Sequence, residues 1–229
     1  MRVRVLFAKE GEARYISHLD LCRTFERAFR RGRIPVSYSQ GFNPRPRFSL
    51  ASALMLGAAS SGEVMDVHLD SKMDPGDFVD ALGSALVPGI RVERARALEP
   101  AARDCAAAVA AARYVITFSG ITGDVRLMVQ RFLQAPSVIV QKQSKGRTRS
   151  TDARAVVLEI EAVSGNQVEV LLDLSGPSLK PSEVALALLG LPQGDTGKDG
   201  PAIGDFQVCR RELLARQDGV PIPLFLAST

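Results

Sequence analysis

Residues 14–47 read RYISHLDLCRTFERAFRRGRIPVSYSQGFNPRPR, and this stretch places a helix directly before a stiff polar loop. Ser17 and Asp20 have the spacing of a capping box, with Asp in place of the usual Glu or Gln, so we expect a helix from about residue 17 to residue 31. Gly32 stands where a helix stop is expected. The apolar positions recur at helical spacing and predict a core-facing side made of Leu21, Phe25, Ala28 and Phe29.

The same helix carries a basic stripe. Its arginines follow one another at i+4, i+3 and i+1, and they are Arg23, Arg27, Arg30 and Arg31. The stripe has two interpretations, which are a binding surface for an anion and a solvated helix face whose charge Glu26 partly offsets.

The loop that follows, residues 38–47, has neither a helical nor a strand period. Gly41 permits a positive φ, and the pair Asn43-Pro44 favours an extended or turn conformation. Because two prolines stiffen the segment, its arginines can be held in place at a low entropic cost. We interpret the loop as a binding element; the alternative is an ordered connection with its aromatic rings in the core.

The side chains of this stretch suit an anionic ligand with exposed rings. Arginines can bind phosphates or carboxylates through two parallel hydrogen bonds, and Tyr or Phe rings can stack on bases. The candidate binding residues are Arg14, Tyr15, His18, Arg23, Arg27, Arg30, Arg31, Tyr38, Gln40, Phe42, Asn43, Arg45 and Arg47.

The run R-Y-x-S-H-L-D-L-x-R-x-x-E-R-A-x-R-R, followed by P-x-x-Y-S-x-G-F-N-P-R-P-R, resembles the signature of the radical-SAM-linked (radical-SAM-associated) uncharacterised bacterial proteins. The resemblance extends through much of the chain, including Ser178-Leu179-Lys180-Pro181. It implies a partner, because modules of that family are fused to, or encoded with, a radical SAM protein. It implies no radical SAM chemistry in this chain.

The amino-acid composition excludes few classes of function. The chain has 229 residues, 46% hydrophobic residues and a formal net charge of +4, which permits an anionic partner without requiring one. The start, MRVRVLFAKE, lacks the apolar core of a signal peptide, and no apolar run approaches the ~18 residues of a membrane span.

Three widely spaced cysteines, Cys22, Cys105 and Cys209, predict reduced thiols in the cytoplasm. No CxxC pattern, P-loop, Rossmann or zinc motif occurs, so we expect no metal and no cofactor.

The predicted elements of residues 1–98 have the order β-α-β-β-α-β, which is the ferredoxin-like pattern. An alanine-rich stretch, residues 99–112, is expected to form a linker helix because Ala is the best helix former. Residues 113–229 repeat the same order, which predicts an α+β protein of two tandem ferredoxin-like domains. A Pro-broken tail, VPIPLF, is expected to pack as an arm.

The second predicted domain contains a basic, polar insertion at residues 142–154, KQSKGRTRSTDAR. It offers little to bury, so we expect it to be exposed and mobile. Four of its basic residues are further binding candidates: Lys142, Lys145, Arg147 and Arg149.

Tandem ferredoxin-like domains with basic loops are similar to RAMP-type RNA-binding proteins, which include CRISPR repeat-processing endoribonucleases. Some of those carry a His near the first helix and a Gly-rich loop before the last strand; here His18 and residues 190–204 hold these places. A lone His18 lacks a paired catalytic constellation. We therefore favour a non-catalytic RNA-binding accessory module that works with a radical SAM protein in RNA modification or processing. Two alternatives stay open: a protein–protein adaptor for that partner, and a RAMP-like endoribonuclease that uses His18.

Overall fold

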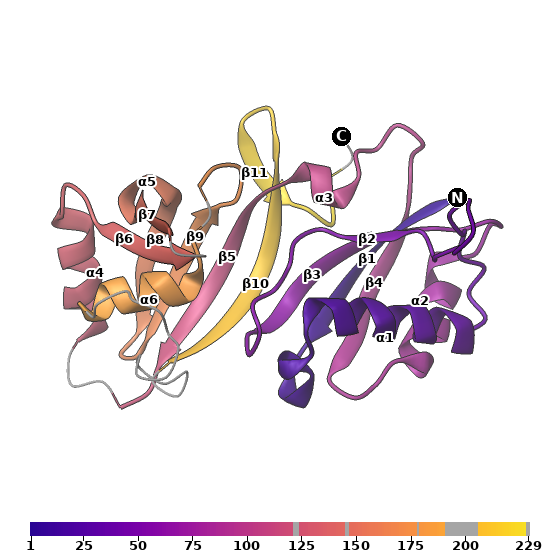
Figure 1. Cartoon of the computed structure of the whole chain (residues 1–229), viewed down its shortest axis with the longest axis horizontal. Coiled ribbons are helices and arrows are strands. Elements are labelled where there is room, and N and C mark those ends of the chain that lie inside the picture. The colour runs from indigo at the N-terminus through magenta and orange to yellow at the C-terminus, as the bar shows by residue number, and fades with distance from the viewer. Residues whose placement is uncertain (121–123, 145–146, 178, 191–205, 228–229) are drawn as a thin grey trace. The chain divides into compact units, whose positions relative to one another are not determined.

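The computed structural model describes residues 1–120, 124–144, 147–177, 179–190 and 206–227 (Figure 1). The fold is mixed α+β, with a large and mostly antiparallel sheet. Contacts divide the chain into two compact units, one of residues 1–110 with 212–229 and one of residues 111–211. No helix in the described ranges is long and apolar enough to cross a membrane.

The first unit begins with a β-α-β-β-α-β series. Its elements are β1 (Arg2–Lys9), the 3-10 helix η1 (Gly11–Tyr15), α1 (His18–Arg31), β2 (Phe48–Leu50), β3 (Ala59–His68), α2 (Pro75–Ala85) and β4 (Ile90–Leu98). The strands pair antiparallel in the order β4-β1-β3-β2. Both long helices cover the same face of these strands (Figure 1).

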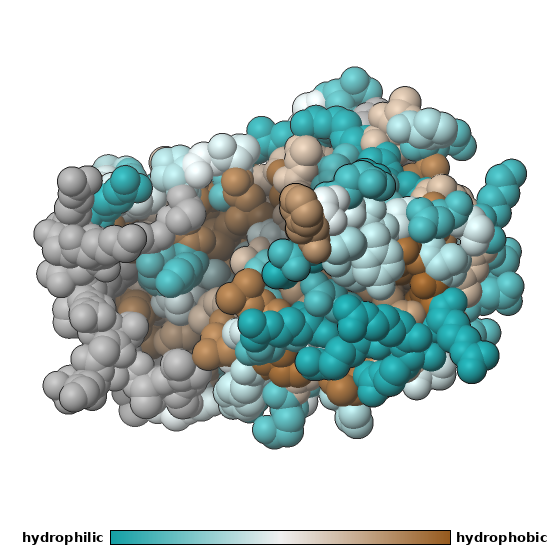
Figure 2. All heavy atoms as spheres, turned by 45° about the vertical axis from the view of Figure 1, so that its right-hand side comes forward, coloured by the Kyte–Doolittle hydropathy of each residue, from teal (hydrophilic) through white to brown (hydrophobic). Residues whose placement is uncertain are grey.

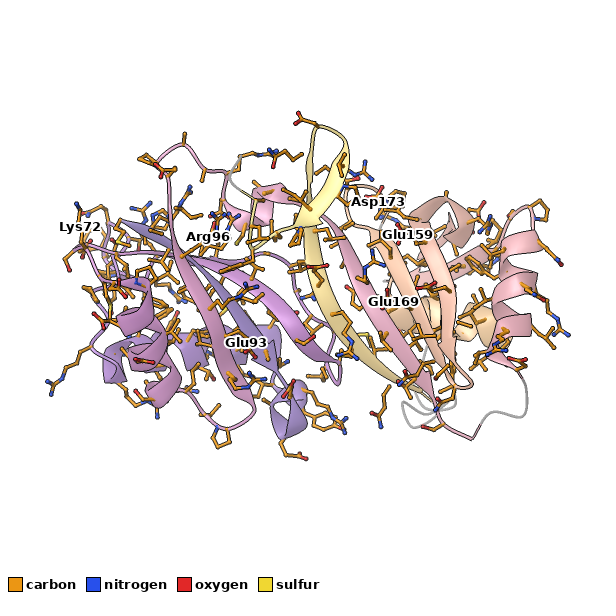
Figure 3. All side chains as sticks on the ribbon, turned by 180° about the vertical axis from the view of Figure 1, so that it is seen from behind. Lys72, Glu93, Arg96, Glu159, Glu169 and Asp173 are labelled. Carbon is orange, nitrogen blue, oxygen red and sulfur yellow. The ribbon has the colours of Figure 1, made fainter. Side chains whose placement is uncertain are left out.

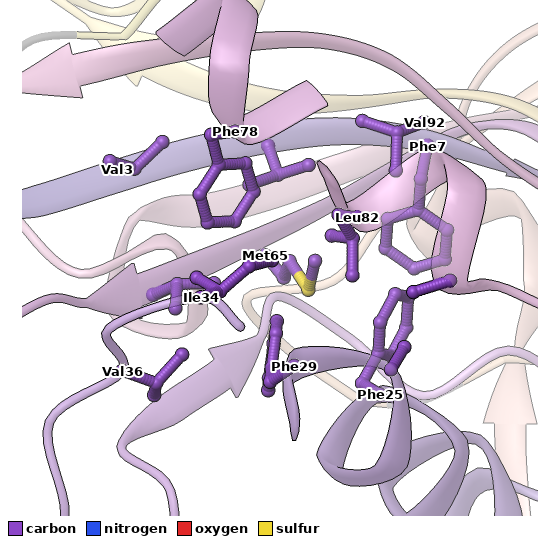
Figure 4. Close-up of a cluster of buried hydrophobic side chains, with 14 of the residues drawn as sticks. Val3, Phe7, Phe25, Phe29, Ile34, Val36, Met65, Phe78, Leu82 and Val92 are labelled. Carbon is purple, nitrogen blue, oxygen red and sulfur yellow. The ribbon is translucent and has the colours of Figure 1, made fainter. Parts of the chain in front are cut away.

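The core of this unit lies between the two helices and the strands. The rings of Phe7, Phe25, Phe29 and Phe48 form a connected cluster, in which neighbouring ring centroids lie 5.0–6.4 Å apart. Figure 4 shows the rings of Phe25 and Phe29, both on α1, near Met65 of β3. The predicted apolar side of α1 is therefore the side that packs on the sheet.

The two ends of α1 have different structural features, which are a side-chain cap at the start and a glycine after the last turn. Ser17 accepts a hydrogen bond from the backbone N–H of Asp20, as the capping-box spacing predicts. Gly32 follows the helix with φ −74°, and the left-handed residue is Arg33, with φ 51°. A Cβ added at Gly32 would lie 2.6 Å from the carbonyl oxygen of Ala81 in α2. Gly32 is therefore required for the close approach of the two helices, and a positive φ is not the reason.

The opposite face of β1 carries a buried ion pair. Arg4 lies directly across from Asp66 on β3, and its Nε and Nη2 donate to the two carboxylate oxygens over 2.7 and 2.9 Å. Asp66 also accepts the backbone N–H of Cys105, and Arg4 also donates to the carbonyl of Arg103. Burial alone would lower the pKa of Arg4, but the hydrogen bond and the charge of Asp66 outweigh it and raise that pKa.

The same ion pair holds the C-terminal segment of the chain. Nη1 of Arg4 donates to the carbonyl oxygens of Leu224 and Ala227 over 3.0 and 2.9 Å. Arg96 of β4 lies directly opposite Arg4 on the neighbouring strand, and it donates to the carbonyl oxygens of Phe225 and Ala227 (Figure 3). Segments more than 100 residues apart therefore meet at one buried cation.

The second unit has its own elements. They are most of β5 (Val109–Phe118), α4 (Val125–Gln134), β6 (Ile139–Ser144), β7 (Arg147–Asp152), α5 (Ala153–Val156), β8 (Val157–Ser164), β9 (Gln167–Asp173), α6 (Pro181–Leu189) and the first part of β10 (Phe206–Gln217). Strands β5, β9 and β8 pair antiparallel, and Arg113 of β5 bridges Glu159 and Glu169 on these strands (Figure 3).

The alanine-rich stretch, residues 99–112, does not form the linker helix that we expected. Only Cys105–Ala108 forms a helix, α3, and β5 begins at Val109. Ala111 and Ala112 are buried in β5, where they pair with Asp173 and Leu172 of β9. The prediction of a helix over residues 99–112 is wrong outside Cys105–Ala108, and from Val109 onward pairing in the sheet outweighs the intrinsic helix preference of Ala.

Two further segments belong to strands. Residues 59–62 are the start of β3, where Ser60 pairs with Lys9. The tail contains a strand, β11 (Val220–Pro223), which pairs with the end of β10. Proline is tolerated there because an edge strand leaves some N–H positions unpaired.

The basic insertion forms the hairpin β6–β7, in which residue 142 pairs with Arg149. Arg149 is exposed. The expected mobility of the insertion stays a prediction, and Lys145 lies outside the described residues.

We expect Gly32→Ala to lower the free energy of unfolding by ~1–3 kcal/mol, because the new methyl group overpacks the contact with α2. The matched control is Gly83→Ala within α2, where an added Cβ meets nothing within 4 Å. That change should stabilise the protein by ~0.5–1 kcal/mol through helix propensity. Urea unfolding followed by circular dichroism checks both; equal effects of the two changes would contradict the close-approach role of Gly32.

Replacing Asp66 by Asn leaves the guanidinium of Arg4 buried without a counter-charge, so we expect a loss of ~3–5 kcal/mol in the free energy of unfolding. Glu159→Gln, which breaks a pair whose carboxylate is 61% exposed, is the control and should cost ~1 kcal/mol or less. Similar costs for the two variants in urea unfolding would show that the Arg4–Asp66 pair does not organise the first unit.

Candidate nucleic-acid interface

A groove lies between the exposed side of α1 and the loop that follows the helix. Its volume is about 410 Å³, within the range of ~300–1,000 Å³ that is typical of ligand sites. The lining residues come from both halves of the predicted stretch and are Arg23, Glu26, Arg30, Phe42, Asn43, Pro44, Arg45 and Pro46. All of them belong to the first unit.

The loop wall of the groove is a closed turn. The backbone N–H of Ser39 donates to the carbonyl of Arg45 over 2.8 Å, and the N–H of Arg45 returns a hydrogen bond to Ser39 Oγ over 3.0 Å. Tyr38 and Pro46 form a β-bridge at its base. Gly41 has φ 128°, a conformation that side chains disfavour. These contacts close the loop without burying its tip.

Phe42 stands at that tip with its side chain fully exposed, at a relative accessibility of 105%. Tyr38 is also exposed, at 40%. Large aromatic side chains are normally buried, because transfer of their apolar area out of water is favourable. A ring held in water beside a groove is therefore available to a ligand, and the alternative that the aromatics of the loop sit in the core is wrong for Phe42.

The helix wall of the groove is basic. Arg23 and Arg30 line it, and Arg27 lies between them on the exposed side of α1. Figure 2 shows hydrophilic side chains gathered in a band along this helix. Arg23 forms an exposed ion pair with Asp20 over 3.0 Å, and Arg27 donates to Thr24 Oγ1 over 3.1 Å. An exposed ion pair is weak, so Arg23 stays available to a stronger anion.

Several predicted residues lie elsewhere in the first unit. Arg47 does not line the groove. Burial of the His68 imidazole lowers its pKa, and the charges of Arg47 and Arg2 lower it further. Arg14 lies over the ring of Tyr15 at 4.8 Å. Arg31 and Gln40 are exposed and do not line the groove.

His18 is exposed in the first turn of α1 and is not part of the groove wall. Within the described residues it makes no hydrogen bond to Arg14, Tyr15 or Arg45, the groups that could assist it in cleaving RNA. The arrangement therefore does not assemble an acid–base pair around His18 in this conformation.

The predicted basic residues of the insertion belong to the second unit. By sequence position Lys142 lies on β6, Arg147 and Arg149 lie on β7, and Arg149 is exposed. The structure thus brings together Arg23, Arg30, Phe42, Asn43 and Arg45 and leaves the other candidates at separate places. The sequence prediction left out Glu26 and the two prolines, although Glu26 lies three residues after Arg23 and four before Arg30, which places it on the same helix face.

A second cluster of polar groups lies on the buried face of the first unit. Ligand atoms of Asp66, Asp104 and Cys105 lie within 4.8 Å of one another. Both oxygens of Asp66 are already hydrogen-bonded to Arg4. Burial, with the charges of Asp66 and Asp104, raises the pKa of Cys105 to about 12, so its sulfur is a neutral thiol. A guanidinium and a protonated thiol both disfavour a cation, so this cluster serves as a structural connection.

The raised pKa and the burial of Cys105 predict slow alkylation. We expect iodoacetamide at pH 8.5 to modify the half-buried Cys22 of the native chain before Cys105, because the thiolate is the nucleophile and Cys105 holds almost none. Peptide mass spectrometry measures the two rates. The urea-unfolded chain, in which both sites should react alike, is the control. Fast labelling of Cys105 in the native chain would contradict its position in the buried cluster.

Comparison with known proteins gives one family. The family model described as "Uncharacterized protein conserved in bacteria (DUF2344)" matches residues 2–181, a range that contains β1, the groove and most of the second unit. A search of curated proteins finds no match to the chain. Because the family model covers far more than half of its length, the chain belongs to the DUF2344 family of uncharacterised proteins conserved in bacteria.

Proposed function

We propose that this protein is a non-catalytic RNA-binding module whose binding surface is the groove between α1 and the loop of residues 38–47. Three arginines from two chain segments line the groove and supply donors for phosphates. A phosphate backbone contacts several such donors at once, which makes it a better ligand for this surface than a single small anion.

The single observation that carries the proposal is the fully exposed ring of Phe42 in the wall of a basic groove. Aromatic stacking on an unpaired base contributes ~1–3 kcal/mol and tolerates any base. Duplex bases have no free face for such a ring, so the arrangement favours single-stranded or looped RNA. The closed loop backbone presents the ring before the ligand arrives, which lowers the entropic cost of binding.

We also propose that each unit is ferredoxin-like, as in the RAMP-type RNA-binding proteins that the element order resembles. The strand order β4-β1-β3-β2 supports this for the first unit. The adjacent antiparallel strands β5, β9 and β8, with helices α4 and α6 between strands in the chain, support it for the second. The hairpin β6–β7 is then an insertion in the second unit.

The proposed partner is a radical SAM protein of the bacterial cytoplasm, to which this module would present RNA for modification or processing. The partner rests on the resemblance of residues 14–47 to the radical-SAM-linked proteins. An adaptor that uses Phe42 as a protein anchor is the competing function, since exposed aromatic residues and arginines also dominate protein interfaces. RNA cleavage by His18 is less well supported, because no assisting group of the described chain contacts it.

The proposal predicts that Arg30→Ala combined with Arg45→Ala weakens binding to single-stranded RNA. The slope of log K against log salt should flatten by ~0.7 for each phosphate that the variant no longer binds. The matched control is Arg126→Ala with Arg131→Ala, which removes the same charge from the exposed side of α4. Fluorescence anisotropy at several salt concentrations measures both variants. Equal slopes for the two double variants would place the binding surface elsewhere.

Phe42→Ala and Phe42→Leu separate the two candidate functions. Stacking needs a ring, so both changes should lower RNA affinity by a similar factor, about tenfold. A protein anchor needs apolar area, so Leu should preserve much of the binding to a radical SAM partner. RNA anisotropy and pull-down with the purified partner are the two measurements. Unchanged RNA affinity with a lost protein complex would support the adaptor and contradict RNA binding.

A further inference from the structure

Glu26 is the one acidic residue among those that line the groove. Arg23 and Arg30 stand three and four residues away on the same helix, at the spacing where ion pairs form. In the described part of the chain, however, the side chain of Glu26 makes no ion pair and no hydrogen bond, whereas Arg23 is paired with Asp20. Glu26 is half-buried and lines the groove, so its carboxylate oxygens are free to accept hydrogen bonds there.

A carboxylate in this position restricts what can bind beside it. It repels a phosphate, so the phosphates of a bound strand must lie toward the arginines. It accepts hydrogen bonds and donates none when ionised, so it favours a group that presents donors. An unpaired nucleobase that stacks on Phe42 would place its edge against the neighbouring wall of the same groove.

Among the four bases of RNA, guanine alone presents two adjacent donors on its Watson–Crick edge, N1–H and the N2 amine. Adenine presents one donor beside one acceptor, cytosine one donor beside two acceptors, and uracil one donor between two acceptors. Two parallel hydrogen bonds to an ionised carboxylate are the stronger kind of hydrogen bond. The acceptor O6 of guanine could be met by the side-chain amide of Asn43, which lines the same groove.

We propose that the groove is a guanine-recognition site, in which Phe42 stacks on an unpaired guanine, Glu26 accepts its N1–H and N2–H donors, and the arginines hold the adjoining phosphates. This inference rests on the proposed RNA binding and gives it a base specificity. Glu26 is then the specificity-determining residue of the site, and the arginines supply affinity that is the same for every sequence.

The test uses the full chain and oligouridine decamers with one central guanosine, inosine or adenosine. Inosine lacks only the N2 amine, so it removes one hydrogen bond to the carboxylate without changing the shape of the ring. Anisotropy should show the guanosine RNA binding about tenfold more tightly than the inosine RNA, as expected for one hydrogen bond to a charged group. The adenosine RNA should bind no better than the inosine RNA.

Glu26→Gln sharpens the test because it is isosteric and removes a negative charge. We expect this variant to bind the inosine and adenosine RNAs as tightly as the native chain or more tightly, and to lose the preference for guanosine. A variant that merely misfolds would lose affinity for all three RNAs, and circular dichroism serves as the check on folding. Glu26→Asp should retain part of the preference for guanosine, since it keeps the charged acceptor.

Two other results overturn the inference in distinguishable ways. Equal affinity of the native chain for guanosine and inosine RNA would reject guanine recognition and leave RNA binding in place. No binding of any decamer at low salt would reject both guanine recognition and the proposed function. An unchanged guanosine preference in Glu26→Gln would assign the preference to a residue other than Glu26.

Discussion

The buried ion pair between Arg4 and Asp66 is the constraint on which the first unit depends. Arg4 lies on the face of β1 away from the helices, where its side chain is 1% exposed. Burying an unpaired cation costs several kcal/mol of desolvation free energy, so a buried guanidinium needs hydrogen-bonding partners. Here the partners are a carboxylate on the next strand and backbone carbonyls from segments that follow β4 and end the chain. The charge thus fixes both the register of β1 with β3 and the place of the C-terminal segment.

This arrangement explains why one face of the sheet is free for packing α1 and α2. The apolar residues Val3, Val5 and Phe7 alternate with Arg4 along β1, so the helices cover the apolar residues while chain segments cover Arg4 on the other face. With its inner side packed on these residues, α1 holds its opposite side rigidly outward. The groove is built on that outer side, and its position is therefore set by the core beneath it.

Local patterns predicted the parts of the site that lie close together in sequence. The helix of residues 18–31, its apolar side and its basic side follow from a period of 3.6, and the loop residues were found from Gly41 and the prolines. The Arg4–Asp66 pair was missed because its members are 62 residues apart and neither carries a local signal. Helix propensity misled the prediction at Ala111 and Ala112, where pairing with β9 decides the conformation. From the sequence, Glu26 only offsets part of the positive charge of the basic stripe. The lack of an ion pair at its side chain is a property of the folded groove and has no sequence signal.

The separation of roles within the groove follows from the chemistry of its walls. Arginines attract any polyanion and give no base preference, a ring stacks on any base, and a carboxylate selects donors. If the groove binds RNA as we propose, the affinity should depend on salt and the base specificity should not. The family model covers the whole groove, while the sequence resemblance that suggests a radical SAM partner rests on the same residues.

The most direct test of this account is ultraviolet crosslinking of the full chain to a guanosine-containing oligouridine, followed by mass spectrometry of the crosslinked peptides. Zero-length crosslinks form where a base stacks on a side chain. We expect the dominant crosslink at Phe42, with any secondary site within residues 23–46. A dominant crosslink in the hairpin of residues 139–152, or none at all when RNA is bound, would contradict the claim that the groove of α1 receives RNA.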